Sequence, residues 1–312
     1  MILLLFDAYI FVDWSAANGV QPRRPTADAV WSGELIPSLN YQQETYHQTR
    51  KDGASHVINV LLEHVKEKRR VLVGFDFPYG YPSGFARALN LPSGTQAWWE
   101  IWTELALRVE DRTNNQNNRF HAAGELNAIT GCGKTGPFWG CPTQYETNNL
   151  KRYSPGFPFI TACGVLQRLR IVENRLPGTQ EVWGLFGPGR VGSQALVGIP
   201  YLYKLRRHLE LVQFSRVWPF ETLFTVTPSV AQGPFVLHAE IWPGVVDDRV
   251  RQMMIIYPDL IRDRAQVRAM CEWAAELDLQ GSLEHLFTQP KGLSPQQIQA
   301  CIEEEGWILG AV

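Results

Sequence analysis

The chain has 312 residues, 45% of them hydrophobic and 19% charged. This composition excludes extended disorder, and the length suits one large domain or a domain with a large insertion. A net charge of −2 excludes a uniformly basic surface, so a polyanionic ligand would need local basic groups or a bound metal ion. The five widely spaced cysteines form neither a disulfide framework nor the paired spacing of a zinc site.

The chain begins with a short apolar run, residues 1–6, that resembles the start of an export signal. Asp7 interrupts this run, no basic residue precedes it, and no small-residue cleavage site follows it. No apolar stretch approaches the roughly 20 residues that cross a bilayer. We therefore expect a cytoplasmic protein without a membrane partner.

The first quarter of the chain predicts three strands, a helix and a fourth strand. Apolar runs indicate strands over 8–16, 27–35 and 70–77, and a weaker pattern indicates another over 39–46. Residues 55–68 carry apolar side chains at helical spacing. The predicted order is therefore β-β-β-α-β.

The central part, residues 83–180, is expected to be an insertion that forms a lid or a small subdomain. Helical patterns cover 96–111 and 159–174. The stretch between them is polar and rich in Gly and Asn, and loops of this length are usually functional or mobile.

The core pattern resumes after the insertion, so 1–82 and 181–312 are assigned to one α/β domain with a mixed sheet flanked by helices. A proline directly after Ser294 and a glutamine at position 297 indicate the start of a last helix. The other expected elements are a short strand over 181–186, a helix over 193–209, strands over 216–220 and 235–241, and a helix over 263–277.

Two apolar strands each end in an aspartate, Asp13 and Asp76. A carboxylate beside such runs is costly to bury unless it is paired, hydrogen-bonded or bound to metal. If the strands are neighbours, both side chains emerge at the sheet edge where open α/β sheets bind ligands, and a divalent cation would relieve their repulsion. Alternatively, each aspartate only caps a turn. The pair, in this topology, favours a metal site.

Three motifs resemble those of a largely uncharacterised bacterial family of predicted ribonuclease-H-like nucleases. Residues 76–82 (Asp-Phe-Pro-Tyr-Gly-Tyr-Pro) match an Asp followed by Pro-x-Gly-x-Pro. Residues 239–243 (Ala-Glu-Ile-Trp-Pro) match a Glu before an aromatic-proline pair, and residues 262–269 match a late helix that begins with Asp. The resemblance covers roughly 8–82 and 181–312. Some relatives carry labels from molybdopterin guanine dinucleotide or cobalamin synthesis.

This resemblance implies a ribonuclease-H-like fold in which Asp13, Asp76, Glu240 and Asp263 bind metal and act in catalysis. The second acidic position of the late-helix motif is Gln266 here, so Asp263 alone represents that motif. Asp263 has an alternative role as the N-cap of a capping box with Gln266. Glu240 has a rival in Glu221, which also follows an apolar strand.

Such a carboxylate group would support two-metal phosphoryl transfer. Hard oxygen ligands suit Mg²⁺ or Mn²⁺ rather than zinc. Two ions would activate a water molecule and stabilise the leaving oxygen of a phosphodiester in a nucleic acid or nucleotide substrate. The residues set no preference between DNA, RNA and free nucleotides, and they do not define an oligomeric state.

A glycine-rich turn, residues 187–192, fits the spacing of a dinucleotide-binding loop before a helix. The strand before it is short and does not open a clear βαβ unit, so a tight turn with close packing is the alternative. In a third interpretation, Arg190 and the helix start at Ser193 hold a substrate phosphate.

The insertion supplies further candidate contacts with substrate, Arg119, His121 and Lys134, on a polar loop. Residues 131–136 imitate the end of a P-loop, but Ala128 stands where that motif needs its first glycine, so an ATPase is rejected.

The sequence therefore predicts first a metal-dependent phosphodiester hydrolase. The alternatives are a nucleotide- or cofactor-binding protein of molybdopterin or corrin metabolism that uses the turn at 187–193, or a catalytically silent ribonuclease-H-like binding module. Fold and function are separate inferences, because one fold serves many chemistries.

Overall fold

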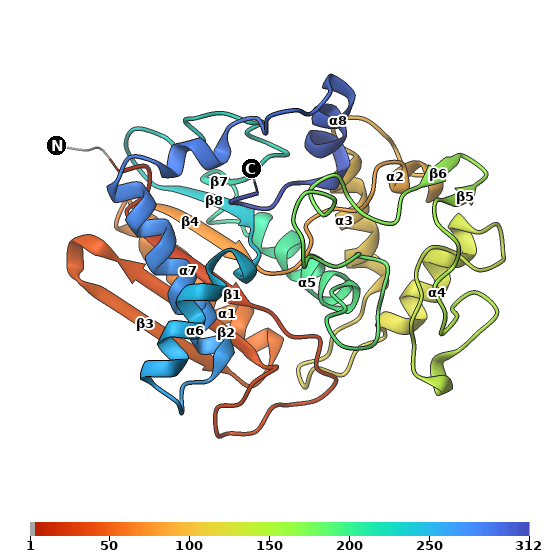
Figure 1. Ribbon diagram of the computed structural model, residues 1–312, viewed down its shortest axis with the longest axis horizontal. Helices are drawn as coiled ribbons and strands as arrows, with labels where there is room; N and C mark the ends of the chain where they lie inside the picture. Colours follow the sequence, from red (N-terminus) through yellow and green to blue (C-terminus); the bar gives the residue numbers. More distant parts are fainter. Residues whose placement is uncertain (1–3, 312) are drawn as a thin grey trace.

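A six-stranded mixed sheet forms the centre of the computed structural model, which describes residues 4–311 (Figure 1). The strands lie in the order β3-β2-β1-β4-β8-β7. β1, β4, β8 and β7 run parallel, while β2 is antiparallel to both of its neighbours. The strands are β1 (Ala8–Asp13), β2 (Val30–Ile36), β3 (Tyr41–His47), β4 (Arg70–Phe75), β7 (Ser215–Val217) and β8 (Phe235–Glu240).

Helices cover both faces of this sheet. On one face, α7 packs against the three strands β1, β2 and β3. On the other face, α1 and α5 lie over the sheet, and α3 packs on α5. The helices are α1 (Arg50–Lys66), α2 (Phe85–Ala88), α3 (Ala97–Arg108), α4 (Arg119–Thr130), α5 (Gly192–Arg206), α6 (Asp247–Ile256), α7 (Arg262–Leu279) and α8 (Pro295–Ala300). None of the helices in the described part of the chain combines the length and the apolar character needed to cross a bilayer.

The alternation of side chains along β1 separates the two cores. Ile10 and Val12 belong to the larger core, which contains residues of α1, α3 and α5. Tyr9 and Phe11 belong to the smaller core with residues of α7. Because successive side chains of a strand point to opposite faces, neighbouring residues of β1 belong to different cores.

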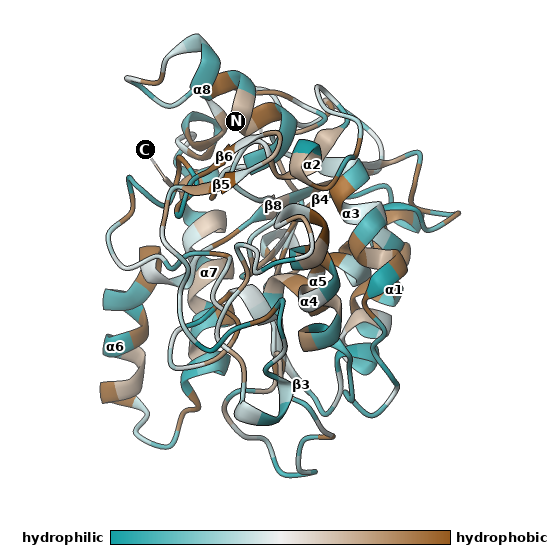
Figure 2. Cartoon of the chain, turned by 90° about the vertical axis from the view of Figure 1, so that its right-hand side faces the viewer, coloured by the Kyte–Doolittle hydropathy of each residue, from teal (hydrophilic) through white to brown (hydrophobic). Residues whose placement is uncertain are grey.

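Helix α1 combines a capping residue with a buried apolar face, and both can be found in the sequence. Thr49 caps α1 by accepting a hydrogen bond from the Asp52 amide at 3.1 Å, and Val57 and Leu61 are fully buried one turn apart. Figure 2 shows hydrophobic and hydrophilic residues alternating along α1. The predicted start lies five residues after the observed one, because the first turn, residues 50–53, carries no apolar side chain that would indicate a helix.

Several predicted elements of the second half lie where they were expected. Helices α5 and α7 and strands β7 and β8 overlap the predicted ranges. Ser294 and Gln297 form the expected capping box at the start of α8. After α8 the chain continues as a π-helical segment, Cys301–Glu305.

The helix predicted over 159–174 is wrong. This segment forms a small antiparallel hairpin of β5 (Phe159–Thr161) and β6 (Gly164–Leu166). Gly164, the first residue of β6, has φ of +138°, which lies outside the helical region, and the turn between the two strands is formed by residues 162–163. The strand predicted over 181–186 is also absent, since only Gly184 forms an isolated bridge, with Trp139.

Two helices lie in segments where the sequence predicts no helix. α4 lies inside the polar stretch of the insertion, and its buried Phe120, Ala123 and Leu126 share one face of the helix. The neighbouring asparagines and glycines hide this spacing in the sequence. α6 begins at Asp247, in a stretch for which the sequence predicts no element.

The segment 83–180 shares its core with the sheet. Trp98 and Trp102 from α3 and Leu126 from α4 belong to the same buried cluster as Val73 of β4. Its aromatic side chains therefore pack mainly inside the protein. The division of the chain into a core and an insertion stays a prediction.

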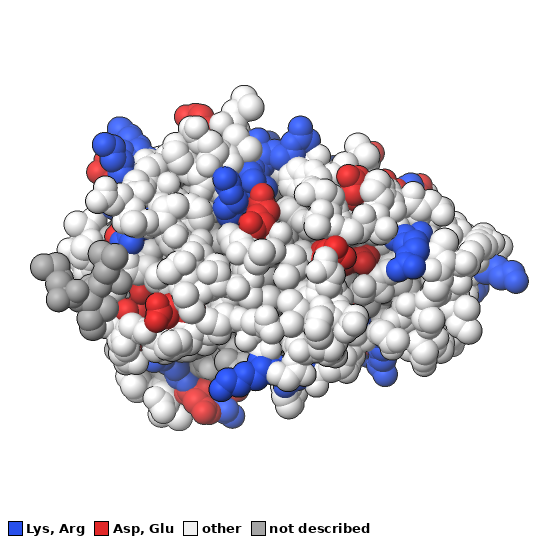
Figure 3. All heavy atoms as spheres, turned by 90° about the horizontal axis from the view of Figure 1, so that it is seen from above, with Lys and Arg blue, Asp and Glu red and all other residues white. Residues whose placement is uncertain are grey.

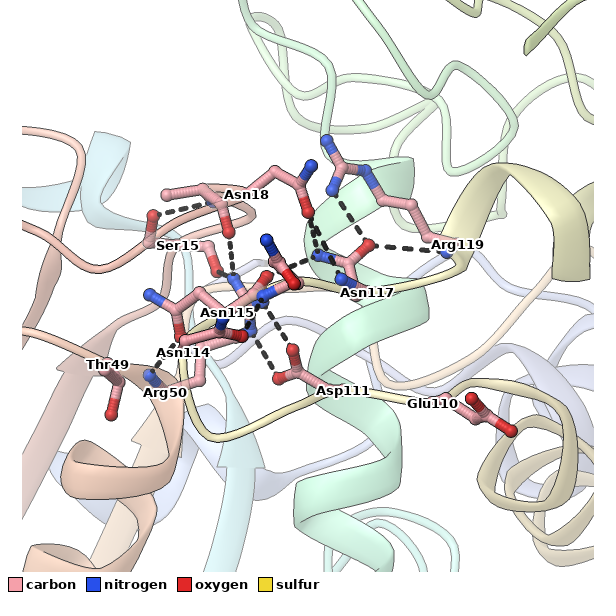
Figure 4. Close-up of polar contacts among 12 residues, drawn as sticks. Ser15, Asn18, Thr49, Arg50, Glu110, Asp111, Asn114, Asn115, Asn117 and Arg119 are labelled. Carbon is pink, nitrogen blue, oxygen red and sulfur yellow. Dashed lines mark hydrogen bonds and ion pairs between the residues drawn. The ribbon is translucent and has the colours of Figure 1, made fainter.

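A buried arginine ties this segment to the loop that follows β1 (Figure 4). Arg50 is fully buried and forms a two-bond ion pair with Asp111, at 2.6 and 2.7 Å. It also donates to the carbonyl oxygens of Ser15, Ala17 and Asn115 at 2.7 to 3.0 Å. One guanidinium group therefore holds α1, the segment after α3 and the loop after Asp13 in fixed positions.

Replacement of Arg50 is predicted to destabilise the protein strongly. Arg50→Met leaves the Asp111 carboxylate and three carbonyl groups without their donor, which should lower the free energy of unfolding by about 3–5 kcal/mol. Urea unfolding measures this change. Lys51→Met, on the exposed face of the same helix, is the control and should change the value by less than about 0.5 kcal/mol. Equal stability of the two variants would contradict this account of Arg50.

Candidate functional site

Asp13 and Asp76 lie side by side at the carboxyl end of neighbouring strands. The parallel register pairs Val12 of β1 with Phe75 of β4, so the next residue on each strand is an aspartate. Adjacent strands are separated by about 4.8 Å. Phe11 and Leu72, two and four residues earlier, belong to the core on the α7 side. Alternation therefore places both carboxylates on that same side.

Asp263 joins this pair from the first turn of α7. One of its carboxylate oxygens accepts a hydrogen bond from the Asp28 amide at 2.7 Å. Asp28 precedes β2 and has φ of +57°, a left-handed conformation that aspartate tolerates. The hydrogen bond fixes the start of α7 beside the end of β1, since α7 packs on β1 and β2.

Burial and neighbouring negative charges raise the pKa values of these acids. Burial raises the pKa of Asp13 well above its ordinary range, and the negative charges of Asp76, Asp263 and Asp28 raise it further. Burial also raises the pKa of Asp76 to about 7, although the hydrogen bond from the Trp14 amide, at 2.7 Å, opposes this shift. The pKa of Asp263 is raised mainly by burial. A proton or a cation would relieve the repulsion.

The structure does not bring Glu240 into this group. Glu240 pairs with Phe75 in the sheet register, and Phe75 faces the larger core, opposite to the aspartates. Both Glu240 oxygens bind the buried guanidinium of Arg170, at 2.6 and 2.7 Å, and one also accepts from the Tyr79 amide. Glu221, the rival candidate, forms a two-bond ion pair with Arg206.

A cleft of about 450 Å³ opens beside these residues. Asp76, Glu240 and Trp242 from the sheet edge line one wall. Arg262 and Gln266, on either side of Asp263, line another, together with Gln194 from the first turn of α5. The Gln194 side chain donates to the Trp14 carbonyl at 2.6 Å. The cleft therefore extends from Asp76 to the N-terminal end of a long helix, while Asp13 and Asp263 lie behind its lining residues.

The glycine-rich turn before α5 is explained by backbone packing. A side chain at Gly192 would lie 2.3 Å from the Val182 carbonyl oxygen, and Gly187 and Gly189 have φ of +119° and +69°. Arg190 forms an ion pair with Glu181 at 3.3 Å. These contacts favour a tight turn over a dinucleotide-binding loop.

Two of the predicted substrate-binding residues bind each other. The Ser193 hydroxyl donates to the Leu185 carbonyl and accepts from the Arg119 guanidinium, at 2.5 and 2.9 Å. His121 and Lys134 are exposed, and among the described residues neither lines the carboxylate cleft. His121 lies 3.4 Å from Glu125 on the same helix.

Within residues 4–311, no three His, Cys, Asp or Glu side chains are arranged to hold a metal ion as they stand.

The residues that sequence reasoning missed near the aspartates are Asp28, Arg262 and Gln194. No local pattern identifies them, because each reaches the site through packing between distant segments.

Comparisons with known proteins identify no relative. The sequence matches no protein-family model, and no curated protein and no solved structure matches it.

The raised pKa values predict an unusual dependence of stability on pH. Between about pH 4 and about pH 7 the carboxyls of Asp13 and Asp76 bind more protons in the folded protein than in the unfolded chain, so their contribution to stability falls as the pH rises through this range. Asp76→Asn cannot ionise, and its oxygen still accepts from the Trp14 amide. At about pH 8 without divalent cations this variant should be more stable than the unmodified protein by about 1–3 kcal/mol.

Urea unfolding at about pH 4 and about pH 8 in a chelating buffer tests this prediction. The stabilisation should shrink at the lower pH, where the carboxyls of both states bind protons. Asp259→Asn, on the exposed turn after α6, should have little effect at either pH. Loss of stability in Asp76→Asn at about pH 8 would show that the carboxylates do not repel.

Proposed function

We propose that this protein is a ribonuclease-H-like, metal-dependent phosphodiester hydrolase whose site is built on Asp13, Asp76 and Asp263. The observation that carries the proposal is the placement of Asp13 and Asp76 next to each other at the carboxyl end of β1 and β4, with raised pKa values. The β-β-β-α-β order and the position of Asp263 at the start of a late helix support the ribonuclease-H-like part. Glu240 is left out, because Arg170 occupies both of its oxygens.

The donor groups fit Mg²⁺ or Mn²⁺. Mg²⁺ is commonly held by one or two carboxylates, with water and substrate phosphate completing the shell. Binding of Mg²⁺ therefore does not require three or more protein ligands. This agrees with the described residues, among which no three His, Cys, Asp or Glu side chains are arranged to hold a metal ion. Oxygen donors without nearby cysteine or histidine do not suit zinc.

Each residue of the site has a distinct role in this proposal. Asp13 and Asp76 would hold the cation, which supplies a Lewis acid and an activated water when bound. The Trp14 amide orients Asp76, and the Asp28 amide orients Asp263. Arg262 and the N-terminal end of α5 provide positive potential in the cleft, where a substrate phosphate would approach the carboxylates.

The distribution of basic side chains on the surface bears on the size of the substrate. On the face drawn in Figure 3, the basic side chains of the described residues form small separate groups, several of them beside acidic ones. A long nucleic-acid duplex usually needs a continuous basic surface. Short or single-stranded phosphodiester substrates are therefore favoured.

Metal binding and hydrolysis are predicted to depend on the same aspartates. Calorimetric titration with Mn²⁺ should show binding that is lost in Asp13→Asn and Asp76→Asn. With Mn²⁺ or Mg²⁺ the protein should cleave single-stranded oligonucleotides, and either variant should lower the rate by a factor of about 100 or more, since the ligand set is incomplete.

The controls separate a lost site from a lost fold. Asp259→Asn should bind Mn²⁺ and cleave as the unmodified protein does. Glu240→Gln is expected to lower stability, because Arg170 loses a charged partner, while the remaining folded protein still binds Mn²⁺. Mn²⁺ binding without cleavage of any oligonucleotide would favour a catalytically silent binding module. Full activity of Asp76→Asn would exclude the proposed site.

A further inference from the structure

A second cavity lies on the side of the sheet away from the carboxylates. It has a volume of about 580 Å³ and is formed by the start of α3, the end of α5 and the segment around β7. It shares no lining residue with the carboxylate cleft. We call it the Arg–Trp pocket. Its aromatic and basic lining residues are Trp98, Trp99, Phe220, Arg206, Arg207 and Arg216.

The aromatic part of this pocket is rigid. Trp98 and Phe220 are stacked, with ring centres 4.8 Å apart and an angle of 3° between their planes. Trp99 is half-buried and packs against Tyr203 at 4.8 Å between ring centres. Because Trp98 and Phe220 are almost fully buried, the pocket has a fixed apolar wall rather than a mobile surface patch.

The charges of the pocket are not balanced by its own carboxylate. Glu221 binds Arg206 with two hydrogen bonds, at 2.7 and 2.8 Å. Arg207 donates to the Tyr203 hydroxyl, and Arg216 donates to the Ser215 carbonyl. Among the residues that the structure describes, neither Arg207 nor Arg216 forms an ion pair. Two positive charges therefore remain beside the aromatic wall.

We propose that the Arg–Trp pocket binds a nucleoside monophosphate. Two arginines match a phosphate dianion in charge and in the fork geometry of their donors. An aromatic wall suits a planar base, which tryptophan contacts without strict preference for one base. The volume lies within the range of small-molecule sites. Thr95 and Gln96, also in the lining, supply polar groups for the sugar.

This proposal does not depend on the hydrolase activity. Binding in the Arg–Trp pocket involves no carboxylate ligand and no metal ion. It can therefore be measured in a chelating buffer, in which the carboxylate cleft holds no divalent cation, and its failure would leave the proposed function of that cleft untouched.

The direct test is calorimetric titration of the full chain in EDTA with adenosine monophosphate, adenosine and inorganic phosphate. Adenosine monophosphate is expected to bind about tenfold or more tightly than either of the other two, because only it engages both the arginines and the aromatic wall. No binding of adenosine monophosphate up to about 5 mM would overturn the proposal. Equal binding of inorganic phosphate would also overturn it, since no base would then be recognised.

Variants assign the binding to this pocket. Arg207→Gln and Arg216→Gln should each weaken binding of adenosine monophosphate about tenfold, while Trp99→Ala should weaken both adenosine monophosphate and adenosine. Arg152→Gln, which alters an exposed arginine outside the pocket, and Asp76→Asn should leave the affinity unchanged. Circular dichroism confirms that each variant is folded. Unchanged affinity in both folded Arg207→Gln and Arg216→Gln would place the ligand elsewhere and overturn the proposal.

Discussion

The structure around the candidate site depends on one constraint, the parallel register of β1 and β4. This register sets Asp13 beside Asp76 in a partly buried environment, where two negative charges repel strongly. The neighbouring backbone offsets part of this cost, through the Trp14 amide for Asp76 and the Asp28 amide for Asp263. A chain that needed only stability would gain from apolar residues at these positions, so the arrangement points to a ligand.

The loop that follows Asp13 is held by groups far away in the sequence. Arg50 binds the carbonyl oxygens of Ser15 and Ala17 and pairs with Asp111 (Figure 4). Gln194 binds the Trp14 carbonyl. The segment 83–180 thus contributes to the position of the site even though its own predicted contacts, His121 and Lys134, lie outside the cleft. Its contact with the loop beside the aspartates runs through Asp111, which pairs with Arg50.

The sequence predicts those parts of the fold whose pattern is local. Asp13 and Asp76 could be found because each ends a strongly apolar strand. The partner of Glu240 could not be predicted, because Arg170 comes from a segment without regular structure that no local pattern connects to β8. The helix predicted over 159–174 is wrong because the apolar spacing of this segment resembles that of a helix, whereas the two-residue turn at 162–163 leaves no such pattern in the sequence.

Asp13 and Asp76 share a confined space, and only a proton or a cation makes the close approach of their carboxylates favourable. Carbon-13 NMR titration of the aspartate carboxyls, with assignment by Asp76→Asn, measures this most directly. The account predicts an Asp76 pKa of about 7 in a metal-free buffer and a clear decrease when Mg²⁺ is added. A pKa near the ordinary value of about 4 that Mg²⁺ leaves unchanged would contradict the account.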